Sequence, residues 1–484
     1  MNHLNRSALK SQKSYPERII QFGEGNFLRA FVDWQVHIMN NTLDFNTGVV
    51  VVQPIEKGLI DLLAQQDNLY TVYLQGIKNG SPSKDHSVVD CITRCINPYE
   101  NFDAYLKLAE NPEMRFIISN TTESGIAFEP SDKLSSAPPK SYPAKLTSLL
   151  YHRYKYFSGD TEKGFIIIPC ELIDRNGEKL QQVVLQLCQL WNLEETFVTW
   201  IKESCTFCCS LVDRIVTGFP RDTINEITSE LGYKDNAVVV GEQFHLWVIE
   251  APDFVAEEFP AHKADLNTLI VKDMTPYRTR KVRILNGSHT ALTPVAYLYG
   301  IETVGEAISH QVVGKFVKEL ISEEIVKTID LPADELNYFA NEVIDRFSNP
   351  FIEHYVMSIS LNSWSKYKAR NLPTLLDYLE REQELPKRMV FALAALISFY
   401  KGKRDNGEAI SLLDEQEILA LFENLWNRDY KSESDLTNIC RVVLSSKLLW
   451  DRDLNEIPNL TKSLSKYLFS IENKGIKEAI EDIL

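Results

Sequence analysis

A strand, a glycine turn and a helix follow one another near the start of the chain, in IIQFGEGNFLRAF (residues 19–31). The apolar run ends at Gly23, Gly25 comes two residues later, and a helical pattern continues to about residue 40. Such a turn lets the backbone approach a pyrophosphate, with the N–H groups of the helix aimed at it. Leu28 stands where the third glycine of GxGxxG would be, so the segment alone fits either a dinucleotide site or an ordinary turn.

Further short apolar runs alternate with helical stretches over the first part of the chain. We expect strands near residues 18–23, 48–55, 114–122, 164–172, 207–216 and 236–242. This alternation is typical of βαβ units around a parallel sheet. After about residue 275 the apolar residues recur with helical periods. The sequence therefore predicts an α/β chain, with a Rossmann-like domain over 1–275 and a mostly α-helical domain over 276–484.

The bulk composition limits the kind of partner. Of 484 residues, 44% are hydrophobic and 24% charged, as in globular proteins, and the net charge is −16. That charge argues against nucleic acid or an anionic membrane surface as a main partner, but not against a small anionic substrate. No secretory signal is visible, and the longest apolar run, residues 389–400, is too short to cross a bilayer. We expect a cytoplasmic protein that is a monomer or a small homo-oligomer.

Cysteines and a YxxxK pattern are assigned structural roles. The eight cysteines are expected to be free thiols, and Cys205, Cys208 and Cys209 to lie in the core on or beside a strand, because no second pair of zinc ligands has suitable spacing. We therefore predict no metal site. Tyr151 and Lys155 match the YxxxK pair of short-chain dehydrogenases, but the chain is too long for that family, and we expect a plain helix there.

The stretch KVRILNGSH (281–289) combines an amine, an amide and an imidazole. On a helix with about 100° per residue, Lys281, Asn286 and His289 fall within one arc of about 140°. A desolvated lysine can act as a base near neutral pH, and an asparagine amide can donate to a developing oxyanion. Spacing alone also fits a solvated helix face.

These segments together resemble the long-chain polyol (mannitol) dehydrogenase family over nearly the whole chain. The resemblance rests on GEGNFLRAF (23–31), SNTTESG (119–125), CELIDRNG (170–177), LVDRIV (211–216), the K-x4-N-x2-H pattern from Lys281, and RFSNP (346–350). Within the family, the amino-acid sequences of the first two segments are most similar to those of members that reduce keto-hexuronates. The resemblance implies metal-free, NAD(H)-dependent interconversion of D-altronate and D-tagaturonate. Fructuronate reduction, mannitol oxidation and NADH sensing without turnover are the alternatives.

The resemblance also implies residue roles. Lys281 would be the general acid and base, Asn286 and Asn176 would hydrogen-bond the reacting oxygen, and His289 would position it. Val212 and Asp213 would line the substrate pocket. The residues implied to bind the cofactor NAD are Phe22, Gly23, Gly25, Asn26, Phe27, Gln53, Thr121, Thr122 and Glu123.

Two positions depart from the family pattern. The acid expected at the end of the second strand to bind the ribose of NAD is absent, because Gln53 stands there and Glu56 follows three residues later. In the segment 358–373, Lys366 matches a family lysine, but Ser358 stands where polyol-oxidising members carry an arginine. A hexuronate carboxylate needs a cation, for which Lys366 is the first candidate and Arg370 the second.

Overall fold

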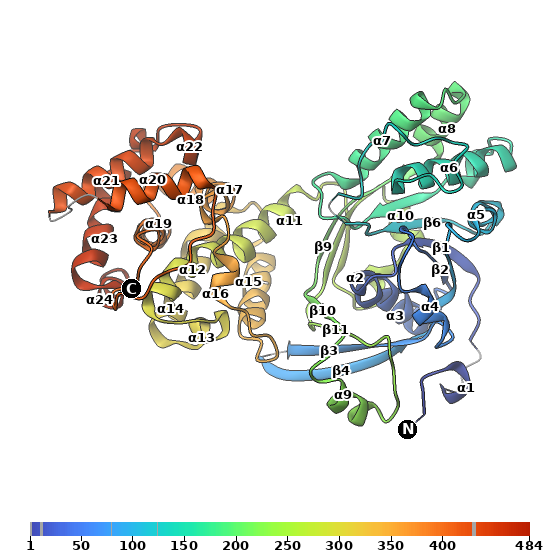
Figure 1. Ribbon diagram of the computed structural model, residues 1–484, viewed down its shortest axis with the longest axis horizontal. Coiled ribbons are helices and arrows are strands. Elements are labelled where there is room, and N and C mark those ends of the chain that lie inside the picture. Colours follow the sequence, from blue (N-terminus) through green and yellow to red (C-terminus); the bar gives the residue numbers. More distant parts are fainter. Residues whose placement is uncertain (1, 10–12, 79, 123, 428–431) are drawn as a thin grey trace. The chain divides into compact units, whose positions relative to one another are not determined.

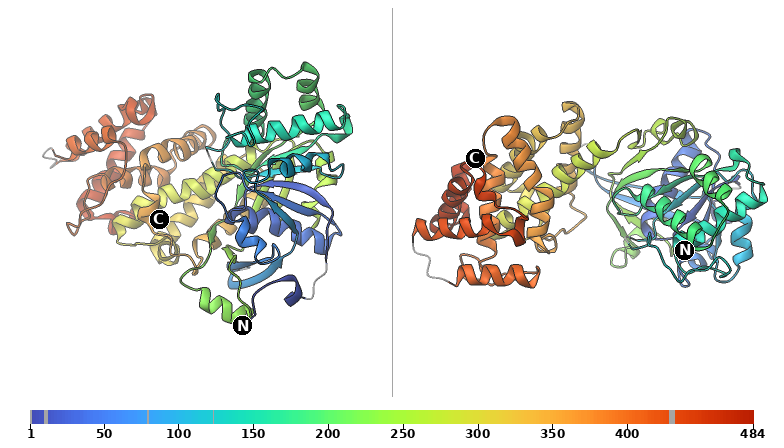
Figure 2. Two further views of the ribbon diagram at one scale, coloured as in Figure 1. Left: turned by 45° about the vertical axis from the view of Figure 1, so that its right-hand side comes forward. Right: turned by 90° about the horizontal axis from the view of Figure 1, so that it is seen from above.

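The computed structural model describes residues 2–9, 13–78, 80–122, 124–427 and 432–484. The chain divides into two compact units, one formed by 1–76 and 83–274, the other by 77–82 and 275–484. Figures 1 and 2 show the first unit as strands covered by helices, and the second as an assembly of helices. Each unit is described by itself below.

A six-stranded parallel sheet forms the centre of the first unit. Its strand order is β5-β2-β1-β6-β7-β8, which is the order of a doubly wound dinucleotide-binding fold. The strands are β1 (Glu17–Phe22), β2 (Gly48–Val52), β5 (Ile92–Ile96), β6 (Phe116–Ser119), β7 (Ile166–Pro169) and β8 (Thr206–Phe207). The predicted Rossmann-like fold and the first four predicted strands are confirmed.

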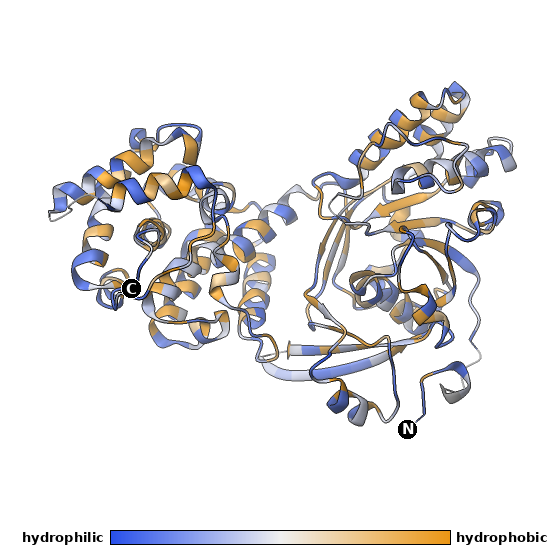
Figure 3. Cartoon of the chain, viewed as in Figure 1, coloured by the Kyte–Doolittle hydropathy of each residue, from blue (hydrophilic) through white to orange (hydrophobic). Residues whose placement is uncertain are grey.

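Apolar side chains alternate between the two faces of this sheet, so each face has its own core. Ile19 and Val51 belong to one cluster, whereas Ile20 and Val50 belong to the other. Figure 3 shows apolar residues concentrated along the strands, for example β6. Burial on both faces explains why these strands are continuous apolar runs. The covering helices include α3 (Trp34–Thr42), α6 (Tyr142–Tyr156), α7 (Asn176–Leu190) and α8 (Glu195–Ser204).

Two smaller sheets were not foreseen. One has the order β10-β11-β3-β4 and the other β13-β12-β9. The predicted strand 207–216 is divided between β8, β9 and β10, and the predicted strand 236–242 is the shorter β11. The strands of the two sheets are β3 (Tyr70–Lys78), β4 (Ser81–Val89), β9 (Cys209–Asp213), β10 (Val216–Gly218), β11 (Val239–Gly241), β12 (Leu246–Glu250) and β13 (Thr268–Val271).

The second unit is helical, as predicted. The run near residue 389 forms α19 (Lys387–Phe399), in which every residue from Arg388 onward is buried. α19 packs against α12 (Ser288–Tyr299) and α23 (Leu460–Lys474). Among the described residues, no helix is long and apolar enough to cross a membrane. Other helices are α11 (Thr275–Arg280), α15 (Ala333–Phe347), α17 (Ser363–Arg370), α18 (Leu372–Glu382), α20 (Gln416–Trp426) and α21 (Glu433–Ser445).

Candidate active site

The glycine turn after β1 has the geometry of a phosphate-binding turn. Gly23 adopts a φ of 120°, and a Cβ there would lie 3.1 Å from both the Asn120 carbonyl oxygen and Leu28 Cδ1. Gly25 is exposed, and a Cβ there would meet no atom within 4 Å. The helical segment starts directly afterwards at Asn26, so its first N–H groups have no carbonyl partner within the helix. The turn therefore fits the pyrophosphate of a dinucleotide.

The buried side chain of Arg29, the arginine of FLRA, holds this turn in place through hydrogen bonds. The side chain is 3% exposed. Its guanidinium donates to the Glu24 carbonyl (3.1 Å), to Asn26 Oδ1 (2.7 Å) and to the Ala237 carbonyl (2.6 Å). It thus holds the residues on both sides of Gly25 and ties them to a distant segment. The sequence alone does not reveal this role, although the GxGxFxRA motif contains the arginine.

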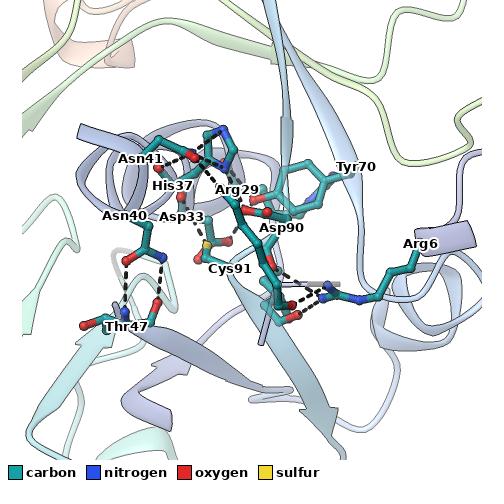
Figure 4. A network of polar contacts seen from close by, with 12 residues as sticks. Arg6, Arg29, Asp33, His37, Asn40, Asn41, Thr47, Tyr70, Asp90 and Cys91 are labelled. Carbon is teal, nitrogen blue, oxygen red and sulfur yellow. Dashed lines mark hydrogen bonds and ion pairs between the residues drawn. The ribbon is translucent and has the colours of Figure 1, made fainter. Parts of the chain in front are cut away.

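A buried carboxyl supports the same helical segment (Figure 4). Asp33 Oδ2 accepts hydrogen bonds from Gln21 Nε2 (3.2 Å) and from the Tyr70 hydroxyl (3.1 Å). The same hydroxyl lies 3.0 Å from the Arg29 carbonyl. Burial raises the pKa of Asp33 to about 7, because the charged form is poorly solvated there. The helix is thus held to β1 and β3 by polar contacts as well as by packing.

The side chains of three residues expected to bind the cofactor are turned inward. Phe22 is fully buried, with its ring 4.8 Å from that of Tyr142, so only its backbone can face a ligand. Phe27 stacks on Phe31 at 4.9 Å. Gln53 is 2% exposed, and its Nε2 donates to the carbonyls of residues 55 and 56 (both 3.0 Å). Asn26, by contrast, is exposed beside the turn.

Glu171 organises the threonine segment after β6. It accepts hydrogen bonds from the Thr121 N–H (3.0 Å), the Thr121 hydroxyl (2.9 Å) and the Ser119 hydroxyl (3.1 Å). Thr122 follows with a φ of 86°, a strained value for a β-branched residue. Glu123 lies outside the described residues. The acid of CELIDRNG therefore shapes the segment expected to bind the cofactor.

Asn176 has a different role from the expected one. Its Nδ2 lies 3.0–3.1 Å from the carbonyls of Pro169, Glu171 and Ser210. Its Oδ1 accepts from the N–H groups of Gly177 (2.9 Å) and Ser210 (2.8 Å). The side chain is fully buried, and both amide N–H donors are used by the backbone. Asn176 thus ties β7 to β9, and no donor remains for a substrate oxygen.

The LVDRIV segment contributes mainly framework. Val212 is 5% exposed and belongs to a hydrophobic core cluster, and Asp213 is 8% exposed at the end of β9. The Arg214 guanidinium donates to the carbonyls of Glu242 (3.0 Å) and Ala30 (2.7 Å) and lies 4.2 Å from the Trp34 ring centroid. The arginine therefore joins this segment to the helix that follows the glycine turn.

The lysine stretch forms a π-helix, η5 (Lys281–Gly287), and not the α-helix assumed from its periodicity. In a π-helix each N–H bonds to the carbonyl five residues earlier, so Asn286 lies about one turn above Lys281. The two side chains share a face for this reason, and both are half-buried. Arg283 is paired with Asp377 at 2.6 Å and with the Thr328 carbonyl at 2.8 Å.

His289 lies among aromatic and basic side chains of the second unit. Its ring stacks on Phe347, with centroids 4.1 Å apart, and meets His354 edge-on at 5.1 Å. Burial lowers the pKa of His289 well below its ordinary range, helped by the charges of His354, Arg346 and Arg370. The ring is therefore neutral at pH 7. Its Nε2 is buried and has no hydrogen-bond partner among the described residues.

The two candidate cations on α17 differ in what they contact. Lys366 Nζ donates to the Ile359 carbonyl at 2.8 Å. Arg370 Nη1 donates to the hydroxyl of Thr290, the residue after His289, at 3.2 Å. Burial lowers the pKa of both groups. The structure thus places Arg370, the second candidate, beside the residue that follows His289 and close enough for its charge to act on the imidazole. Arg346 of RFSNP, for which the sequence predicted no role in the site, belongs to the same basic group.

The cysteines and the YxxxK segment lie where the sequence indicated. Cys205, Cys208 and Cys209 are free and buried on or beside β8 and β9. Tyr151 and Lys155 lie on α6, where both contact Glu194. Glu178, Cys209 and Glu250 come close enough to ligate an ion in principle, but Arg175 already pairs with both glutamates.

Two family models match the chain. The mannitol dehydrogenase Rossmann domain matches residues 17–263, and the mannitol dehydrogenase C-terminal domain matches 273–472. The chain belongs to the mannitol dehydrogenase family. Among curated relatives, altronate oxidoreductase of Phocaeicola vulgatus is 53% identical over the full length of both chains. Altronate oxidoreductase of Bacillus subtilis is 49% identical over 99% of this chain and 98% of its own.

Solved structures share the fold of this mannitol dehydrogenase family member. D-sorbitol dehydrogenase superposes with a TM-score of 0.80 at 22% identity, covering 99% of this chain and 100% of that one. Mannitol 2-dehydrogenase of Pseudomonas fluorescens, in ternary complex with NAD and D-mannitol, has a TM-score of 0.66 at 21% identity over 99% of both chains.

Proposed function

We propose that the chain is an NAD(H)-dependent oxidoreductase that interconverts D-altronate and the keto acid D-tagaturonate in hexuronate catabolism. The observation that carries this proposal is full-length identity of about half to relatives named altronate oxidoreductase. The open glycine turn and the lysine, amide and imidazole groups supply the chemistry that such a reaction needs. We place the activity in the cytoplasm, in a monomer or a small homo-oligomer that acts without a metal ion.

Lys281 is proposed to move the proton. In the oxidising direction its neutral amine takes the proton of the substrate hydroxyl while the carbon bearing it loses a hydride. In the reducing direction the ammonium returns that proton to the carbonyl oxygen. The nicotinamide, when bound, supplies or accepts the hydride. Asn286, on the same face of η5, donates an amide N–H to the oxygen as it gains charge.

His289 is proposed to position the same oxygen. The stacking on Phe347 fixes the plane of the imidazole, and the lowered pKa keeps the ring neutral. A buried Nε2 without a partner among the described residues is a group that a substrate hydroxyl can satisfy. The imidazole therefore orients the substrate and does not compete with Lys281 for the proton.

Arg370 is proposed to bind the substrate carboxylate, with Arg346 contributing positive charge nearby. A guanidinium has five donors, and the Thr290 hydroxyl accepts from only one nitrogen of Arg370. Paired N–H groups match a carboxylate better than a single ammonium does. Lys366, whose Nζ is bonded to the Ile359 carbonyl, takes a secondary role.

A screen of keto substrates tests the proposal. Purified protein is mixed with NADH and either tagaturonate, fructuronate or fructose, and the NADH absorbance is followed, with NADPH in parallel. We expect oxidation of NADH with tagaturonate above all. Oxidation with fructose alone would overturn the sugar-acid assignment. No oxidation with any of the three would favour a protein that binds the dinucleotide without turnover.

A further inference from the structure

The end of β2 raises a specific question about how the dinucleotide is selected. In doubly wound folds an acid at this point binds the hydroxyls of the adenosine ribose, and its charge disfavours the 2′-phosphate of NADP. Here Gln53 occupies the position. The neighbouring Glu56 has an exposed side chain, and its backbone carbonyl accepts from Gln53 Nε2 at 3.0 Å. The expected acid must therefore come from elsewhere or be missing.

Glu24, between the two glycines of the turn, lies at this same point. β1 and β2 are adjacent and parallel, with Phe22 beside Val52, and the Gly23 N–H bonds to the Val52 carbonyl at 3.1 Å. The Glu24 side chain extends across to the loop that follows β2, where its Oε1 accepts from the Leu59 N–H at 3.2 Å. A carboxylate from the first strand thus reaches the end of the second.

Gly58 marks the place where two acceptor oxygens converge. A Cβ at this residue would lie 1.9 Å from Glu24 Oε1 and 2.4 Å from Gln53 Oε1. Gly58 therefore packs directly against both oxygens from one side, and any side chain at this residue would clash with them. Gly58 itself is exposed, so the pair lies beneath a loop that has no side chain at this point. Gln53 turns its acceptor oxygen this way because its Nε2 donates to two carbonyls of the loop.

The carboxylate of Glu24 lacks donors. The residue is 6% exposed, and its Oε2 is buried without a hydrogen-bond partner among the described residues. Arg29, the nearby cation, directs its N–H groups to the Glu24 carbonyl and to other residues instead. Burial raises the pKa of Glu24, as expected for a poorly solvated carboxyl. A ligand that brings hydroxyl donors would relieve this cost.

We propose that Glu24 is the acid that binds the adenosine ribose diol, and that with Gln53 it selects NAD(H) over NADP(H). This inference rests on the dinucleotide binding in the proposed function. One of the two vicinal hydroxyls would donate to Glu24 Oε2, which has no partner among the described residues, and the other to Gln53 Oε1. A 2′-phosphate supplies only acceptors and negative charge, so the same pair repels it. The residue that determines cofactor specificity, Glu24, thus lies in the glycine turn and not at the end of β2.

Binding measurements on the intact chain test this assignment. Calorimetric titrations give the Kd of NADH and NADPH for the wild-type protein, Glu24→Gln and the matched control Glu56→Gln. We expect Glu24→Gln to weaken NADH about 10-fold or more, with little loss for NADPH, so that the preference for NADH contracts. Glu56→Gln should bind both as the wild-type protein does. Equal losses for NADH and NADPH in Glu24→Gln, or none, would overturn the assignment.

A ligand-side probe keeps the inference testable if Glu24→Gln does not fold. The wild-type protein is titrated with NAD⁺ and with its analogue that lacks the adenosine 2′-hydroxyl. We expect the analogue to bind about 10-fold more weakly, and equal affinity would contradict the inference. Failure of the wild-type chain to bind either dinucleotide would overturn the proposed function together with this inference. Selective NADH binding without turnover of a sugar acid would overturn only the substrate assignment.

Discussion

The imidazole of His289 stacks on the ring of Phe347, with centroids 4.1 Å apart and planes 24° from parallel. The two residues come from α12 and α15, which are separate in the sequence and joined here by one aromatic contact. The Nε2 atom of His289 has no hydrogen-bond partner among the described residues, so the stacking contact holds the imidazole in its orientation. Phe347 belongs to RFSNP and His289 to KVRILNGSH, so the contact joins these two family segments in space.

Replacing Phe347 by leucine should therefore loosen His289. We expect kcat/KM for tagaturonate to fall about 10-fold, since misplacement of a positioning group raises the barrier without removing it. NADH should bind as in the wild-type protein. Steady-state kinetics and a calorimetric titration with NADH check this. An unchanged kcat/KM would show that His289 does not depend on the stack.

Lys281→Ala should have the largest effect on the chemical step. Removal of a general acid and base typically costs about 10²- to 10⁴-fold in rate, so kcat should fall by that amount while the Kd of NADH changes little. Lys272→Ala is the matched control, because its ammonium is exposed and pairs with the exposed Asp253. A rate for Lys281→Ala near that of the control would remove Lys281 from the proton-transfer role.

Substitutions of the two cations of α17 should differ in how strongly they affect the reduction of each substrate. Arg370→Ala is expected to lower kcat/KM for tagaturonate by about 10- to 100-fold, because it removes a charge-assisted pair with the carboxylate. Any slow reduction of fructose, which has no carboxylate, should be much less affected. Lys366→Ala should have the smaller effect on tagaturonate. The reverse order between the two variants would restore Lys366 as the carboxylate ligand.

Asp33 should make stability depend on pH. Its pKa rises from 3.8 to about 7 on folding, so the folded chain holds this proton more tightly than the unfolded chain. The group therefore costs stability as the pH rises from about 4 to 7, by up to a few kcal/mol. Tyr70, Arg29, Cys91 and Cys95 face it within this network.

Asp33→Asn removes this dependence. The variant should therefore gain stability relative to the wild-type protein: the difference in the free energy of unfolding, variant minus wild type, should rise between pH 4 and pH 7 and stay level above. Urea denaturation of both proteins at pH 5 and pH 8 measures the difference. A difference that is the same at both pH values would show that Asp33 is not protonated in the folded chain.

The central sheet could be predicted from the sequence because its strands are buried on both faces and consist of continuous apolar residues, as in Gly48–Val52. The strand Ser81–Val89 could not, because SPSKDHSVV is largely exposed and has no apolar alternation. The π-helix from Lys281 to Gly287 was also missed, since apolar spacing over so short a segment does not separate one helix type from another.

Lys281, Asn286 and His289 could be selected as candidates because they lie within one short segment, and their catalytic roles stay a prediction. A residue was missed where its role depends on contacts between distant segments. Arg29 bonds to Ala237, and Glu24 bonds to Leu59, and neither pairing has a local signal. Asn176 shows the converse, because only the family resemblance implied a role at the reacting oxygen, whereas its amide N–H groups are used by backbone carbonyls.

The ratio of kcat/KM for D-altronate to that for D-mannitol, measured with NAD⁺ on the wild-type chain, tests the central claim most directly. Both substrates offer a secondary hydroxyl, but only altronate carries the carboxylate that Arg370 is proposed to bind. The account predicts a preference for altronate of about 100-fold or more, the value of a desolvated charge pair. Equal rates, or a preference for mannitol, would contradict it.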